Sequence, residues 1–92
     1  MSLMVYDKNE VRETLVALVR DVLKRKRLDA KAEDIVEGVS LVTQVGIDSL
    51  DILQVVAAVE KKYGLRIPEE ELRSADDIGK FLKVVEKHWP KA

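Results

Sequence analysis

The sequence predicts an all-α fold: a small bundle of three main helices plus one short helix, with a long loop between the first two main helices. Three observations support this prediction. Apolar residues recur at helical spacing in three segments, residue types that begin or end helices stand at the segment boundaries, and no alternating strand pattern extends beyond a few residues. The chain has 92 residues, 47% of them apolar, which suits one modest core, so we expect a single domain over residues 1–92.

The first main helix is expected from Asp7 to about Arg27. Asp7, followed three residues later by Glu10, resembles an N-terminal capping arrangement, and the basic run 24–27 stands where a helix C-terminus favours positive charge. That run has no interleaved aromatic residues, so we interpret it as a solvated helix end rather than a nucleic-acid site. The apolar residues at helical spacing are Val11, Leu15, Leu18, Val19, Val22 and Leu23.

Residues 28–47 are expected to form the long loop, because they show no sustained period. A connection of about 20 residues is unusual in a compact domain unless it is functional or pinned to the core. We expect a short helical turn around Ala32–Val36 and permissive backbone at Gly38 and Gly46. The apolar side chains that can pin the loop are Ile35, Val36, Val39, Leu41, Val42, Val45 and Ile47.

The second main helix is expected from Ser49 to Tyr63. Asp48 is a favourable N-cap residue, and Gly64 tolerates the left-handed conformation common just past a helix end. On a helical wheel, one apolar arc forms the natural core face: Ile52, Val55, Val56, Val59 and Tyr63. A second group lies about 125° away: Leu50, Leu53 and Ala57. This group is either buried as well or faces a partner or cargo beside Ser49, and the residues alone leave both readings open.

The remaining elements are a short helix and the last main helix. Pro68 prevents an early restart, and Glu69–Leu72 can form the short helix. Ser74 and Asp77 are expected to act as a capping pair for a last helix that runs to about Lys87. We expect a partly exposed terminus at residues 88–89, with the tryptophan folded back on the bundle. The expected core face of the last helix is Ile78, Phe81, Leu82 and Val85.

Composition excludes several classes of function. The chain has no cysteine, which excludes disulfides and thiolate sites, and its formal net charge of -1 argues against generic binding to nucleic acid. No apolar run approaches the roughly 20 residues that span a bilayer, and the first residues lack the pattern of a secretory leader. We therefore expect a cytoplasmic protein that binds neither nucleic acid nor membranes.

The stretch GIDSLD, residues 46–51, places Ser49 between two aspartates. A hydrolase nucleophile is not indicated, because the stretch lacks the G-x-S-x-G elbow and the single histidine, His88, stands near the C-terminus. Asp48 and Asp51 belong to no calcium-binding loop, so we expect no metal. A phosphodiester on Ser49 would be favoured by the helix N-terminus and opposed by the aspartates. The chemistry of the residues permits such a modification without singling it out.

Four ordered features occur between Leu41 and Leu72: an apolar approach to Gly46, the Asp48-Ser49-Leu50-Asp51 core, an aromatic residue at Tyr63, and the sequence Ile67-Pro68-Glu69. Together they resemble the centre of an acyl carrier protein, and the similarity extends over about residues 30–87. The resemblance implies that Ser49 carries a covalent 4'-phosphopantetheine arm, whose thiol holds acyl groups as thioesters. It also implies that Gly46 and Asp48 belong to the attachment site.

By the same resemblance the chain is a carrier and not an enzyme. Its partners would be a phosphopantetheinyl transferase and acyl-transferring, condensing or acyl-activating enzymes, and it would act as a monomer. Leu50, Asp51, Leu53 and Ala57 would contact a partner or the cargo. The carrier would serve fatty acid synthesis, polyketide synthesis or a dedicated acyl pathway.

The second helix departs from the strongly acidic helix typical of carriers in bacterial fatty acid synthesis. Gln54, Lys61 and Lys62 dilute its acidic residues, and residues 43–44, Thr-Gln, stand where acidic residues are common. This composition argues against housekeeping fatty acid synthesis, so a dedicated pathway has comparable weight. GIDSL favours the acyl branch over peptidyl carriers, which often resemble G-G-x-S-L here. Two alternatives stay open: a peptidyl or aminoacyl carrier, and an unmodified helical adaptor that uses the second apolar group only to bind proteins.

Overall fold

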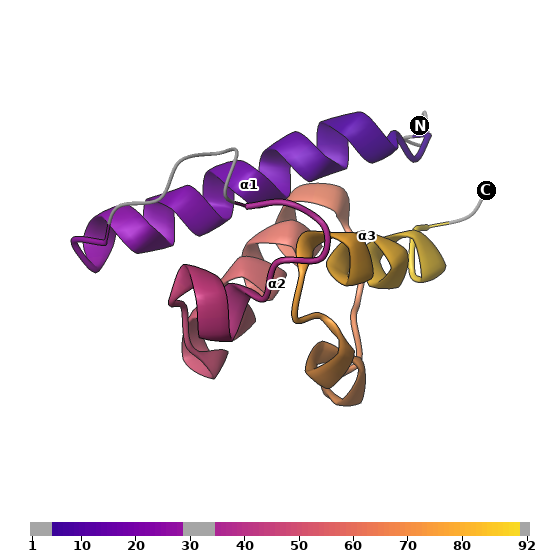
Figure 1. The fold of residues 1–92 in the computed structure, drawn as a ribbon. Helices are drawn as coiled ribbons and strands as arrows, with labels where there is room; N and C mark the ends of the chain where they lie inside the picture. The colour runs from indigo at the N-terminus through magenta and orange to yellow at the C-terminus, as the bar shows by residue number, and fades with distance from the viewer. Residues whose placement is uncertain (1–4, 29–34, 91–92) are drawn as a thin grey trace.

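The computed structural model describes residues 5–28 and 35–90, and every regular element in these ranges is helical (Figure 1). The main helices are α1 (Lys8–Arg25), α2 (Ser49–Tyr63) and α3 (Ile78–Lys87). Two short elements join them: η2 (Leu41–Val45), a single π-helical turn, and η3 (Glu69–Ser74), a 3₁₀ helix. This architecture confirms the predicted all-α bundle of three main helices and a short one, and adds the π turn.

Helix α1 begins where the cap chemistry predicted. The Asp7 carboxylate accepts hydrogen bonds from the backbone N–H groups of Asn9 (3.0 Å) and Glu10 (3.3 Å), which satisfies two donors of the first turn. The helix ends at Arg25, two residues before the predicted boundary. Its buried face consists of Val11, Leu15, Val19, Val22 and Leu23, while Leu18 is half-buried. The predicted apolar stripe is therefore the face that packs on the rest of the bundle.

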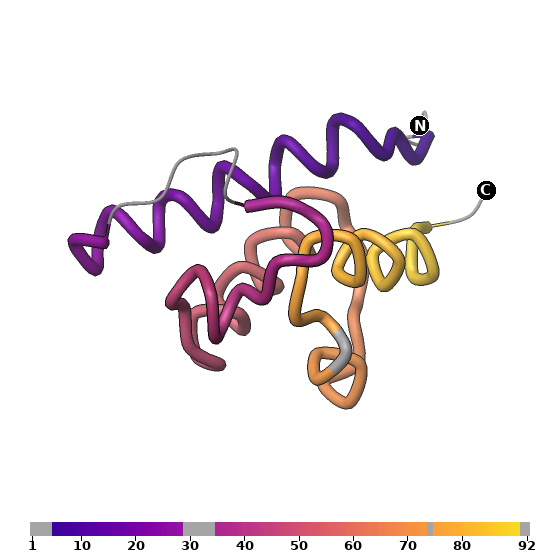
Figure 2. Tube along the Cα trace, viewed as in Figure 1, coloured from indigo at the N-terminus to yellow at the C-terminus, as the bar shows by residue number. Residues whose placement is uncertain are grey.

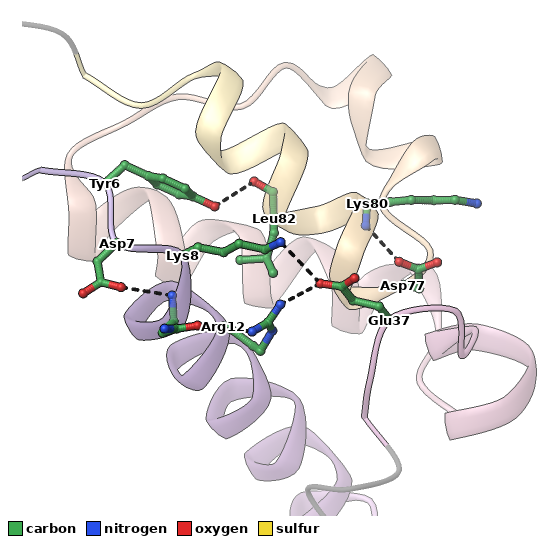
Figure 3. Close-up of polar contacts among 9 residues, drawn as sticks. Tyr6, Asp7, Lys8, Arg12, Glu37, Asp77, Lys80 and Leu82 are labelled. Atoms are coloured by element: carbon green, nitrogen blue, oxygen red, sulfur yellow. Dashed lines mark hydrogen bonds and ion pairs between the residues drawn. The ribbon is translucent and has the colours of Figure 1, made fainter.

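The loop after α1 is pinned to the bundle, as predicted, but by fewer apolar side chains and with the help of an ion pair. Ile35, Leu41 and Ile47 are buried, whereas Val36 and Val42 are exposed. Glu37 accepts a hydrogen bond from Arg12 of α1 at 2.7 Å, and this contact lowers the pKa of the Glu37 carboxyl (Figure 3). Val39 and Val45 are half-buried. Ile35 and Val36 are not helical, and the rest of the turn predicted at Ala32–Val36 lies outside the described residues.

The π turn η2 directs the loop toward α2. The Ser40 hydroxyl accepts a hydrogen bond from the Thr43 N–H at 3.1 Å and donates one to the Asp76 carboxylate at 2.9 Å, so the turn is tied to the segment before α3. It ends at Gly46, which has a φ of 101°. A residue with a side chain rarely adopts this left-handed conformation, which confirms Gly46 as a permissive backbone position.

Helix α3 begins later than its predicted capping pair. Asp77 is the N-cap, and its carboxylate accepts a hydrogen bond from the Lys80 N–H at 2.8 Å (Figure 3). Ser74, the other residue of the predicted pair, is the last residue of η3, and its side chain lies outside what the structure describes. Buried Ala75 carries the chain into the core before the new helix begins. The predicted core face of α3 is confirmed: Ile78, Phe81, Leu82 and Val85 are all buried.

The start of α1, the end of α2 and the end of α3 meet at one end of the molecule. Figure 2 shows the chain before α1 close to the segment after α3, and the Tyr6 and Trp89 rings lie edge to face with their centroids 5.2 Å apart. Trp89 also packs on the Tyr63 ring at 4.9 Å. Trp89 is half-buried, so the prediction that it folds back on the bundle is confirmed.

Candidate functional site

Ser49 is the first residue of α2 and is exposed. The preceding segment fixes its position: Gly46 turns the chain, buried Ile47 anchors it in the core, and Asp48 adopts an extended backbone conformation. The Asp48 carboxylate caps the helix, as predicted. Because the following helix runs without interruption to Tyr63, the serine hydroxyl is presented at the tip of a rigid element.

Asp48 and Asp51 form a reciprocal capping box. Asp48 Oδ1 accepts a hydrogen bond from the Asp51 N–H at 2.9 Å, and Asp51 Oδ2 accepts one from the Asp48 N–H at 3.0 Å. The hydrogen bond from the Asp51 backbone is the main cause of a lowered pKa at Asp48, and Lys26 adds to it. The sequence analysis identified the Asp48 cap but not the return bond from Asp51, although an acidic residue three positions after the cap is its usual signal.

Lys26, at the end of α1, binds both of these aspartates. Its ammonium donates to Asp51 Oδ2 at 2.5 Å and to Asp48 Oδ2 at 3.3 Å. Both contacts raise the pKa of Lys26, and the hydrogen bond to Asp51 contributes most. The interpretation of the basic run as a solvated helix end holds for Lys24, Arg25 and Arg27, which are exposed, but it missed this pairing. No local pattern could reveal it, since the partners lie 22 and 25 residues apart along the chain.

The structure separates the two apolar groups of α2. All five residues of the predicted core face are buried. By contrast, Leu50 is 69% exposed, Leu53 is 39% exposed and Ala57 is also exposed. The alternative in which both groups are buried is therefore wrong, and an exposed apolar surface begins directly beside Ser49.

An open groove of about 690 Å³ runs between the start of α2 and η3. The residues that line it are Ser49, Ile52, Leu53, Glu69, Glu70, Leu72 and Arg73. Neither Gly46 nor Ala57 lines this groove: Gly46 lies in the turn before the helix, and Ala57 lines a separate groove with Leu65 and Ile67. The η3 residues were missed as site residues, because a single 3₁₀ segment has no hydrophobic period that marks one face.

Contacts from α3 hold η3 in place beside the groove. The Lys87 ammonium donates to the Glu71 carboxylate at 2.6 Å, and the His88 ring contacts the same carboxylate. Both partners lower the pKa of Glu71, and Lys87 contributes most. Leu72 packs against the hydrophobic core. The wall opposite Ser49 is thus fixed by polar contacts on one side and apolar packing on the other.

Within residues 5–28 and 35–90, no three His, Cys, Asp or Glu side chains are placed to bind a metal ion together. The helices in these ranges are also too short or too polar to cross a membrane.

Comparisons with known proteins add a family to this geometry. Residues 13–85 match the sequence model of the family described as phosphopantetheine attachment site, whose covalent cofactor is 4'-phosphopantetheine. The chain is 37% identical over 60 residues to the acyl carrier protein of Sinorhizobium fredii and to acyl carrier protein AcpP of Rhizobium meliloti. Each of these two alignments covers 65% of this chain and 77% of the relative.

A third relative is the acyl carrier protein of Wolinella succinogenes, which is 31% identical over 61 residues, 66% of this chain and 80% of the relative. The family match includes α2 and η3, the two elements that form the groove, and begins within α1. Fold, family match and relatives agree, and the chain belongs to the acyl carrier protein family.

Proposed function

We propose that Ser49 is the residue that carries the 4'-phosphopantetheine arm of this acyl carrier protein. The observation that carries the proposal is the position of Ser49: an exposed hydroxyl at the first residue of α2, beside the groove formed with η3. Ser40, by comparison, is half-buried and its hydroxyl is already bonded to Asp76 and to the Thr43 N–H. The geometry therefore favours Ser49 over Ser40 as the attachment point.

The surroundings of Ser49 fit a phosphodiester. The N-terminus of the 15-residue helix α2 carries partial positive charge and favours an anion. Asp48 and Asp51 oppose the anion, but the Lys26 ammonium is hydrogen-bonded to both carboxylates and offsets part of their charge. Oxygen ester formation needs an accessible hydroxyl, which the exposed serine supplies.

When bound, the arm supplies a terminal thiol that holds an acyl group as a thioester. The chain's own residues anchor and present it. Ser49 fixes the attachment at the rigid helix start, the capping box keeps that start folded, and exposed Leu50 and Leu53 offer apolar surface to a partner or to the cargo. In this proposal the domain spans residues 1–92 and serves a phosphopantetheinyl transferase and acyl-handling enzymes.

The charge on α2 bears on the pathway. Gln54, Lys61 and Lys62 are exposed, so a partner meets a helix of mixed charge rather than an acidic one. For this reason we propose a dedicated acyl pathway as a candidate of equal weight with fatty acid or polyketide synthesis. A single-domain adaptor that uses Leu50 and Leu53 without modification is the competing function, because these side chains are exposed in either case.

One experiment separates the carrier from the adaptor. The apo protein is incubated with coenzyme A, magnesium and a broad phosphopantetheinyl transferase, and its intact mass is recorded. Wild type and the matched control Ser40→Ala should each gain one phosphopantetheinyl unit, whereas Ser49→Ala should gain none. No gain by wild type with several transferases would favour the adaptor, and gain by Ser49→Ala would move the attachment elsewhere.

A further inference from the structure

We infer that Lys26 is a positioning residue for the attachment site: it holds the Asp48–Asp51 capping box and offsets its negative charge, so that residue 49 can carry an anion without destabilising the start of α2. This inference deepens the proposed function and rests on it where the anion is the phosphodiester. It concerns the C-cap residue of α1, outside the stretch that resembles the attachment motif.

The contacts of Lys26 are selective for this role. Its ammonium bonds Asp48 Oδ2, the oxygen of Asp48 that does not cap the Asp51 N–H, and Asp51 Oδ2, the oxygen that accepts from the Asp48 N–H. The lysine therefore completes the capping box without displacing either of its bonds. It also ties the end of α1 to the start of α2, two segments that Figure 1 places at the same end of the molecule.

Burial distinguishes the two partners. The Asp51 side chain is only 14% exposed, whereas that of Asp48 is 62% exposed. A largely covered carboxylate is less well screened by water, so its charge acts more strongly on a neighbouring anion. Removing Lys26 would leave two carboxylates beside residue 49, and any anion placed there would be the third negative group in the first turn of α2.

A plain structural tether is the competing reading, since exposed ion pairs commonly contribute little beyond holding two side chains together. The two readings differ in one measurable respect. A tether stabilises the protein by the same amount whatever the charge of residue 49, whereas an electrostatic role makes the effect of Lys26 depend on that charge. Coupling between positions 26 and 49 is therefore the decisive quantity.

The test compares the nearly isosteric variants Ser49→Asp and Ser49→Asn, which differ in one negative charge, in the wild-type and Lys26→Gln backgrounds. Glutamine keeps a hydrogen-bond donor but removes the charge. Melting temperatures are recorded by circular dichroism at low salt and at 1 M salt. The Asp-to-Asn difference is the melting temperature of the asparagine variant minus that of the aspartate variant. We expect this difference to be about 2–5 °C larger in the Lys26→Gln background than in the wild-type background. At 1 M salt the Debye length falls to about 3 Å, and most of this difference should disappear.

Two further variants control the experiment. Lys26→Arg restores the charge and should return the coupling toward the wild-type value. Lys24→Gln removes another exposed charge from the same helix end, at a residue with no ion pair among the described residues, and should show little coupling. Equal Asp-to-Asn differences with and without Lys26, or coupling as large for Lys24, would overturn the inference.

The same comparison extends to the modified protein. The change in melting temperature on attachment of phosphopantetheine should be less favourable in Lys26→Gln than in wild type, again at low salt only. If wild type accepts no arm at Ser49, the proposed function fails, while the Asp and Asn variants still decide the role of Lys26. If the arm is attached but the two melting shifts are equal, the inference fails and the proposed function stands.

Discussion

Helix α2 is built differently at its two ends, although one uninterrupted run of 15 residues carries both. At its end, Tyr63 is 5% exposed, packs on Trp89 and shares a hydrogen bond of 2.8 Å with the Thr14 hydroxyl of α1. At its start, Leu50 is 69% exposed and Ser49 faces solvent. Burial fixes the end of the helix, whereas the exposed start is held by buried Ile47 before it, by a capping box and by one lysine.

The largest effect should follow from damage to the buried interior. Phe81 of α3 is 1% exposed, and Phe81→Ala would leave a cavity that the surrounding side chains fill only in part. We expect a loss of about 3 to 5 kcal/mol in the free energy of unfolding, a large fraction of the stability of a small domain. Denaturant melts provide the measurement. Ser49→Ala is the matched exposed change and should cost far less, so equal losses would contradict the division between the two regions.

The contrast between neighbouring residues Ile52 and Leu53 gives the next prediction. Leu53→Glu should change the free energy of unfolding by about 1 kcal/mol or less, because the Leu53 side chain is 39% exposed whereas Ile52 is only 7% exposed. Ile52→Glu, one residue earlier, would bury an unpaired charge and should unfold most of the protein. Far-ultraviolet circular dichroism during equilibrium unfolding distinguishes the two.

Leu53→Glu should then impair acyl transfer to or from partner enzymes, because a partner must desolvate the new charge. Transfer is measured on the modified protein after its stability has been established. Unfolding of Leu53→Glu would place that side chain in the core, and normal transfer by a stable variant would remove it from the recognition surface.

A smaller effect should appear at low pH. The pKa of Asp48 is lower in the folded protein, so this carboxylate stabilises the fold at neutral pH, and the contribution is lost as pH falls through the folded pKa. Asp48→Asn keeps a good N-cap but removes the charge. Wild type should therefore be more stable than Asp48→Asn at pH 7, and the difference should shrink as pH falls below about 4. Thermal melts from pH 7 to pH 2 provide the measurement. A difference that stays constant over this range would contradict a stabilising negative charge on Asp48.

Local patterns predicted both ends and the buried face of α2 well. Asp48, Gly64 and the buried arc of α2 follow from cap chemistry, left-handed backbone and helical period, which act over a few residues. The exposed state of Leu50 and Leu53 did not follow, because the width of an apolar arc does not say how much of it the neighbouring elements cover. That answer required the position of η3.

The features that the sequence could not reveal join distant segments. The Lys26 contacts, the Arg12–Glu37 pair and the bond from Ser40 to Asp76 each connect residues at least 22 positions apart, and no periodicity marks either partner. The π turn η2 was missed as well: Ser40 caps it locally, but the turn is also tied to Asp76, which lies 36 positions from Ser40. The cytoplasmic location and monomeric state stay predictions.

We propose that the exposed start of α2 is the working end of the molecule. Fragmentation mass spectrometry of the protein after phosphopantetheine attachment tests this claim most directly. We predict that the added group maps to Ser49 alone and that fragments containing Ser40 or Thr43 keep their unmodified mass. Localisation of the group to any residue other than Ser49 would contradict the account.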